Sequence, residues 1–186
     1  MNNSGMKIFD RHAVRLHRER AADGFGSFSF LFREAAERLV DRLFDIRREF
    51  PLALDLGSHG GLVADILAGR DSIQSIVQCD LSEKLVRRAS GLRIVGDEEV
   101  QPFAPATFDL VISSASFHWI NDLPGTLVQA LRSLRPDGLL LVNFFGGETL
   151  KELRRSLLEV ESEIKGGVSP RVSPFTDVRD AGALLQ

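Results

Sequence analysis

An acidic residue, Asp55, stands just ahead of a group of glycines that ends at Gly61. The apolar run 52–56 that contains it is typical of a buried parallel strand, and helical spacing resumes over 62–67. A strand that passes through glycines into a helix presents free backbone N–H groups to a ligand. Glycine also lets that ligand approach without a clash with Cβ. The segment therefore predicts a ligand-binding turn, and the alternative is a tight strand-to-helix turn that binds nothing.

The spacing of the glycines separates two classes of ligand. The turn of nicotinamide- and flavin-binding folds reads G-x-G-x-x-G, but that register from Gly57 would need glycine where His59 and Leu62 stand. Instead, Asp55 precedes Gly57 by two residues and Gly61 follows. A carboxylate in this place suits a ligand with an ammonium group, such as the methionyl amine of S-adenosylmethionine (SAM), better than a pyrophosphate.

Further acidic residues follow the next two predicted strands. Asp80 ends the β-rich run 73–79, the position where doubly wound folds bind ribose hydroxyls; a plain cap or turn residue is the alternative. The run 92–95 predicts another strand, with Asp97 and Glu98 at its C-terminal end. Carboxylates there can accept a hydrogen bond from an adenine amino group, whereas the alternative is a polar loop.

A fourth predicted strand, 108–113, leads into a loop that carries His118 and Trp119, the only tryptophan of the chain. Loops at the carboxyl edge of a parallel sheet form the sites of α/β proteins. We interpret the pair as a pocket wall, and direct participation of His118 in catalysis is the alternative. No cluster of metal-ligating residues stands out in the sequence. The predicted cofactor-binding residues are Asp55, Gly57, Ser58, Gly61, Asp80, Leu81, Asp97, Glu98 and Ser113.

Strands and helices alternate along the chain, which predicts an α/β fold with a mostly parallel sheet. We expect an N-terminal helical cap or lid over residues 1–48 and a SAM-binding domain over residues 49–186. In the first part, Arg11, Arg15 and Arg18 recur at i, i+4 and i+7, so they would share one helix face. That face is either solvated or a docking surface for an acidic or carboxylate-bearing partner.

The other helices follow from apolar spacing and from their caps. An amphipathic helix is expected over 32–47, where it would cover the sheet. Ser82 has the type and position of a helix N-cap. Asp122 opens another predicted helix, which has proline in its first turn.

After the fourth strand, the turn 135–138 should lead to a fifth strand over 139–145. Thr149 with Glu152 three residues later has the spacing of a capping box. It predicts a helix that ends at the glycines 166–167. We expect a loop and one short helix after it.

Composition limits the broad class of protein. A chain of 186 residues with 44% apolar and 26% charged residues is ordinary for one soluble domain. A net charge of −3 gives no general attraction to nucleic acid, and no apolar run has the length of a membrane span. Without a signal- or transit-peptide pattern, and with a single cysteine, we expect a cytoplasmic protein in a reducing compartment.

The acidic strand ends and the Arg-Pro-Asp-Gly turn at 135–138 together resemble class I SAM-dependent methyltransferases of the type 11 group, whose first motif reads D-x-G-x-G-x-G. His59 stands where the middle glycine of that motif usually is. Longer stretches resemble the mitochondrial complex I assembly factor 5 family and its bacterial relatives. The most specific are Gly-Gly-Glu-Thr-Leu at 146–150, Glu-Leu-Arg at 152–154 and Ser-Pro-Arg-Val-Ser-Pro-Phe-Thr at 169–176.

The resemblance implies SAM as the cofactor and a methyltransferase that acts on a small molecule, a carrier protein or a protein. A second implication is a SAM-binding assembly factor that hydroxylates an arginine of a respiratory complex I subunit. A non-catalytic scaffold with the same fold is the third alternative. Methyltransferases of this class normally end with two more strands, which are not predicted here. The sheet edge left open would allow homo-oligomers to form, or another subunit to cover it.

Overall fold

The computed structural model describes residues 7–185. The chain divides into two compact units, one up to Phe144 and the other from Phe145 onward. The first unit contains the sheet and all the predicted cofactor-binding residues. The separation of a lid from a binding domain between residues 48 and 49 stays a prediction.

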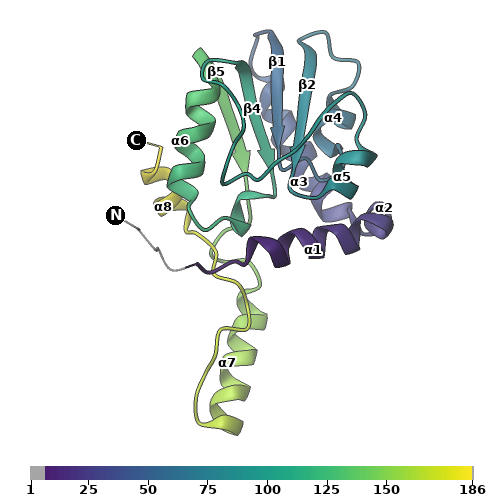
Figure 1. The fold of residues 1–186 in the computed structure, drawn as a ribbon. Helices are drawn as coiled ribbons and strands as arrows, with labels where there is room; N and C mark the ends of the chain where they lie inside the picture. Colours follow the sequence, from purple (N-terminus) through teal and green to yellow (C-terminus); the bar gives the residue numbers. More distant parts are fainter. Residues whose placement is uncertain (1–6, 186) are drawn as a thin grey trace. The chain divides into compact units, whose positions relative to one another are not determined.

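Five parallel strands form the sheet of the first unit, in the order β3-β2-β1-β4-β5 (Figure 1). Each strand runs parallel to its neighbours, because the connections between strands return the chain to the same edge. The predicted α/β class with a mostly parallel, Rossmann-like sheet is confirmed. The strands are β1 (Phe50–Leu56), β2 (Ile73–Asp80), β3 (Leu92–Val95), β4 (Phe108–Ser114) and β5 (Leu134–Asn143).

Helices pack on both faces of this sheet, and β4 shows how the sequence allows it. Successive side chains of a strand point to opposite faces. Leu110 and Ile112 belong to the core cluster that includes residues of α3 and α4, whereas Val111 belongs to the cluster that includes residues of α6. The helices of the first unit are α1 (Arg11–Ala21), α2 (Phe25–Phe28), α3 (Phe30–Phe44), α4 (Leu62–Leu67), α5 (Glu83–Arg88) and α6 (Leu123–Ser133).

Two helix caps predicted from the sequence are confirmed. The Ser82 hydroxyl accepts a hydrogen bond from the backbone N–H of Leu85 at 3.2 Å and caps α5. The Asp122 carboxylate accepts from the backbone N–H of Gly125 at 2.9 Å and caps α6. Since α5 follows β2 directly, its cap also fixes the backbone beside Asp80.

The fifth strand differs from its prediction, because it begins at Leu134 rather than at residue 139. Phe108 pairs with Leu134, but Leu110 pairs with Leu139, so the register shifts between these pairs. Residues 135–138, which were predicted as a turn, lie between these two pairs, opposite Asp109 alone. They form a bulge within the strand.

The second unit contains α7 (Lys151–Lys165) and α8 (Val178–Ala183), with no strand among the described residues 145–185. The predicted capping box is wrong: the helix begins at Lys151 after Leu150, whose φ is 55°, and no side chain caps it. The predicted glycine stop is confirmed at Gly166, which has a φ of 66°.

Over residues 7–185, no helix combines the length and the apolar character that a membrane crossing requires. β5 is the last strand of the sheet and pairs with β4 alone. Association of two copies through this edge stays a prediction.

Candidate functional site

The carboxyl ends of the strands meet at one edge of the sheet, because the strands are parallel. Asp55 lies near the end of β1, where it pairs in register with Gln78 of β2. Asp80 pairs with Val95, the last residue of β3, shortly before Asp97. The predicted acidic residues therefore lie at successive strand ends, as expected from their spacing.

The turn after β1 needs its glycines. φ is 81° at Gly57, 80° at Gly60 and 96° at Gly61, values that glycine adopts with little cost. At Gly57 a Cβ would also overlap the Ser116 hydroxyl and lie 3.2 Å from Glu98 Oε1. Side chains of the protein itself therefore fill the space in front of the first glycine.

His59, which replaces the middle glycine, has a left-handed φ of 45° that is unfavourable for a residue with a side chain. Its backbone N–H donates to Asp80 Oδ2 at 3.0 Å, and its ring atom Nε2 lies 3.1 Å from the carbonyl oxygen of Ala115. Because a carbonyl oxygen only accepts, Nε2 carries the ring proton. Burial lowers the pKa of His59. Its neutral ring packs against Phe25 and Phe32.

Asp55 is fully buried, and neither of its carboxylate oxygens has a hydrogen-bond partner within residues 7–185. Burial and the neighbouring charge of Asp80 raise the pKa of Asp55 well above its ordinary value. The charged form is disfavoured because neither water nor a donor stabilises it. A cationic group would satisfy this side chain, which is the role predicted for it.

Asp80 is also fully buried, but its carboxylate has three partners. Oδ1 accepts from the backbone N–H of Ser82 at 2.9 Å and from Arg18 Nη1 at 3.1 Å. Oδ2 accepts from the backbone N–H of His59. Two backbone donors thus fix the orientation of the carboxylate, and the third partner comes from α1.

Asp97 and Glu98, in the loop after β3, bind two arginines of α1. Arg18 Nη1 donates to Glu98 Oε1 at 2.7 Å, and Arg11 Nη2 donates to Asp97 Oδ1 at 2.5 Å. Arg11 also forms an ion pair with Glu98. Burial alone would raise the pKa of Glu98, but the charges of Arg18 and Arg11 lower it to about 2. Glu98 is therefore ionised at neutral pH.

We call Arg11, Arg18, Asp80, Asp97 and Glu98 the arginine–carboxylate cluster. Burial alone would lower the pKa of Arg18, but Glu98 and Asp80 raise it, so the guanidinium stays charged although the residue is only 9% exposed. The sequence did not assign the two arginines to the site. Their seven-residue spacing on one helix face was the available signal, but it did not identify acids of the same chain as their partners.

Arg15, predicted to share that helix face, is exposed. The acids of the cluster are paired with Arg11 and Arg18 instead. The reading of the face as solvated is therefore wrong for two of the three arginines. Their acidic partner belongs to the chain itself.

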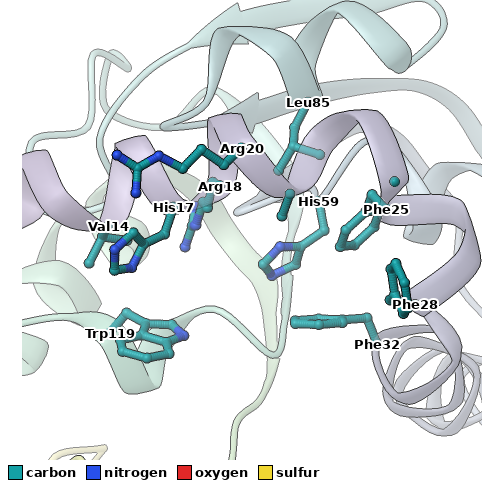
Figure 2. A pocket seen from close by; sticks show the side chains of 12 residues that line it. Val14, His17, Arg18, Arg20, Phe25, Phe28, Phe32, His59, Leu85 and Trp119 are labelled. Carbon is teal, nitrogen blue, oxygen red and sulfur yellow. The ribbon is translucent and has the colours of Figure 1, made fainter.

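A cavity of about 380 Å³ lies against α1, α2 and α3 in the first unit (Figure 2). Trp119 lines it, as predicted, whereas His118 is buried and is not among the lining residues. Burial and the charges of His59 and Arg18 lower the pKa of His118 to about 4. The cavity wall is mostly apolar and aromatic, with contributions from Val14, Phe25, Phe28, Phe32, His59 and Trp119.

The other predicted site residues have different environments. The Ser58 hydroxyl is buried and has no hydrogen-bond partner in the described part of the chain. The Ser113 hydroxyl donates to the carbonyl oxygen of Leu56 at 2.5 Å and thereby joins β4 to β1. Leu81 is partly buried beside Asp80. In residues 7–185 there is no group of His, Cys, Asp or Glu side chains that could hold a metal ion.

The residue types at this edge fit SAM. The unpartnered carboxyl of Asp55 suits an ammonium group, and Asp80 and Asp97 are acceptors for hydroxyl and amino groups. The positive-φ glycines provide the close backbone approach. The space between these groups is occupied by the guanidinium of Arg18 and the side chains of Glu98 and Ser116.

Comparison with known proteins identifies similar chains. Residues 54–142 match a family model described as a methyltransferase domain. The human mitochondrial arginine-hydroxylase NDUFAF5 is 44% identical over 187 residues, which cover 97% of this chain and 54% of that protein. Malonyl-[acyl-carrier protein] O-methyltransferase 1 of Coxiella burnetii is 32% identical over 176 residues, which cover 95% of this chain and 60% of that protein. The chain thus spans little more than half the length of these relatives.

Solved structures share the fold at lower identity. A SAM-dependent methyltransferase from Thermotoga maritima aligns with a TM-score of 0.66 at 19% identity, over 91% of this chain and 78% of that one. The [4+2]-cyclase SpnF aligns with a TM-score of 0.62 at 19% identity, over 82% of this chain and 56% of that one. Since a cyclase is among these proteins, the fold alone does not determine the reaction.

Proposed function

We propose that this chain, a homologue of the NDUFAF5 proteins and the malonyl-[acyl-carrier protein] O-methyltransferases, is a class I methyltransferase. It binds SAM and transfers a methyl group. The observation that carries the proposal is the convergence of Asp55, Asp80 and Asp97 at one sheet edge, beside a turn of positive-φ glycines. A scaffold that had lost its ligand would have no use for the orphaned carboxyl of Asp55, whose burial without a partner is unfavourable.

Each residue of the site has a definite role in this proposal. Asp55 holds the ammonium group, Asp80 accepts from the ribose hydroxyls, and Asp97 with Glu98 accepts from the adenine amino group. Ser58, Leu81 and Ser113 complete the walls around the cofactor. Bound SAM supplies an electrophilic methyl group.

The protein's part in the reaction is to hold the acceptor in line with that methyl group and to exclude water. Trp119 and the aromatic wall around His59 form the surface on which an acceptor would rest. His59 and His118 have lowered pKa values and are neutral near pH 7. Of the two rings, His59 lines the cavity and His118 does not, so His59 is the one placed to accept a proton from an acceptor that must lose one.

Two acceptor classes come from the names of the relatives. The malonyl-[acyl-carrier protein] O-methyltransferases point to a carboxyl group on a small molecule or a carrier protein. The arginine-hydroxylase name points to a second candidate function, hydroxylation of an arginine in a protein. The 44% identity over nearly the whole chain favours keeping this candidate. The family resemblance makes a subunit of respiratory complex I its first substrate to test.

Mass spectrometry of a candidate acceptor separates the two reactions when the acceptor is incubated in air with the protein, SAM and a reductant, because hydroxylation consumes dioxygen and two electrons. Methylation adds one methylene unit to the mass, whereas hydroxylation adds one oxygen atom. We expect the methylene gain, with S-adenosylhomocysteine formed in equal amount. An oxygen gain would replace the proposal by the second candidate.

The cofactor site is tested separately with Asp55→Asn, which preserves volume and touches none of the arginine contacts. Loss of a charged hydrogen bond should weaken SAM binding by about tenfold to a hundredfold in calorimetry. Asp71→Asn is the matched control, because Asp71 is exposed and lies before β2, at the other end of the strand. Equal affinity of the two variants would remove Asp55 from the site.

A further inference from the structure

The position of Arg18 raises a question that the proposed function does not answer. Its guanidinium bonds to Asp80 at 3.1 Å, to Glu98 at 2.7 Å and to the Ser116 hydroxyl at 3.1 Å. Ser116 and Glu98 in turn fill the space in front of Gly57. The groups expected to receive a nucleoside are therefore already bound to one another through a side chain of α1.

Further contacts hold α1 in this position. Arg11, two helical turns before Arg18, pairs with Asp97 and Glu98 and donates to the carbonyl oxygen of Trp119 at 3.0 Å. Residues seven apart lie on one helix face, so both arginines reach the same edge of the sheet. Just before the helix, the backbone N–H groups of Ile8 and Phe9 donate to the Asn121 side chain at 2.8 Å.

Electrostatics explains why the arginines and a ligand would compete. Asp80 and Glu98 are fully buried, and a buried carboxylate must be paired or hydrogen-bonded. In this structure α1 supplies the positively charged partner of each carboxylate, in addition to the two backbone donors to Asp80. A nucleoside with an ammonium and a sulfonium group could supply hydroxyl, amino and charge partners instead. Glu98 and Ser116, which fill the space in front of Gly57, are bonded to Arg18, so a ligand can enter that space only when these bonds are released.

We propose that α1 is a self-inhibitory latch, in which Arg18 holds Glu98 and Ser116 in the space in front of Gly57 and must release them before SAM can bind. The proposal rests on the proposed function, since it takes SAM as the ligand of this edge. It gives the N-terminal segment a regulatory role: any partner that draws α1 away from the sheet would raise the affinity for the cofactor. Because only unlatched molecules bind, the apparent affinity equals the intrinsic affinity multiplied by the unlatched fraction.

Calorimetry of Arg18→Met and Arg15→Met with SAM tests the latch. Methionine keeps much of the side-chain length but leaves Asp80 and Glu98 without the guanidinium. If about nine molecules in ten are latched, Arg18→Met should bind SAM roughly tenfold more tightly than the wild type. Arg15→Met, at an exposed position of the same helix, should bind as the wild type does.

The outcomes separate the latch from the proposed function. SAM binding that is equal or weaker in Arg18→Met overturns the latch and leaves the cofactor site standing. Absence of SAM binding in the wild type and both variants overturns the proposed function and the latch together. If Arg18→Met does not fold, the wild type alone provides the test, by hydrogen exchange of the α1 amides with and without SAM.

The latch predicts that SAM accelerates amide exchange over Arg11–Ala21, whereas most ligands slow exchange near their site. It also predicts a red shift of the fluorescence of Trp119, which the departure of Phe9 and Arg11 would expose to water. Slower exchange of α1 in the presence of SAM would mean that the helix closes over the cofactor, and would overturn the latch.

Discussion

At the scale of single residues, three buried carboxyl groups lie in three different environments. Asp55 has no partner in the described structure and a raised pKa, which favours its neutral form. Asp80 is fixed by two backbone donors and Arg18. Glu98 is ionised between Arg18 and Arg11. An unpaired buried charge is costly, so the carboxyl groups with cationic partners are ionised and the one without is neutral. Asp55 is therefore the group available to an incoming cation.

The state of Asp55 predicts that SAM binding releases a proton. An ammonium group beside the carboxyl would lower its raised pKa again, so the proton would leave on binding. Near pH 6 the amine of the ligand is already protonated and takes up none. The binding enthalpy should therefore vary with the ionisation enthalpy of the buffer for the wild type but not for Asp55→Asn. Buffer-independent enthalpies for both proteins would contradict this assignment.

His118 predicts a loss of stability in mild acid. Its pKa is lowered to about 4 in the folded protein, against about 6.5 when unfolded. The unfolded chain therefore binds the proton first, so the stabilisation is complete above about pH 6.5 and is lost as the pH falls toward 4.

Between pH 7 and pH 5 the loss from His118 should be about 2 kcal/mol. Urea unfolding at the two pH values measures it. The free energy of unfolding of His118→Gln should fall less over this range by that amount. An equal fall for the variant and the wild type would show that His118 is not the responsible group.

At the scale of elements, local patterns predicted what depends on neighbours in sequence. The strands β1 to β4, the caps Ser82 and Asp122, and the stop of α7 all follow from short apolar runs, capping residues and glycines. The start of β5 did not follow, because its register depends on a bulge opposite Phe108 in another strand. The binding of α1 to Glu98 was also missed, since its partners lie about eighty residues apart in the chain.

The Ser82 cap is the element-scale feature with the clearest energetic consequence. Ser82→Ala removes the acceptor for the first turn of α5 and should lower the free energy of unfolding by about 1 kcal/mol. Ser27→Ala is the matched control at an exposed position of the same unit, with an expected change below about 0.5 kcal/mol. Chemical denaturation followed by circular dichroism compares the two. Coincident midpoints would exclude a stabilising cap.

At the scale of the whole molecule, the site is a consequence of the sheet. A parallel sheet in the order β3-β2-β1-β4-β5 brings Asp55, Asp80 and Asp97 from distant parts of the sequence to one edge. The convergence was predictable from their position after successive strands. The side chains that fill the space between them were not predictable, because the ion pairs that hold α1 there join residues far apart in the sequence.

Calorimetric titration of the whole chain with SAM, and separately with NAD, tests the central claim most directly. We predict saturable binding of SAM at one site and no binding of NAD, because the turn lacks the glycine register and offers acids to a cationic nucleoside. Binding of NAD without binding of SAM would contradict the account, and binding of neither would leave only a scaffold with this fold.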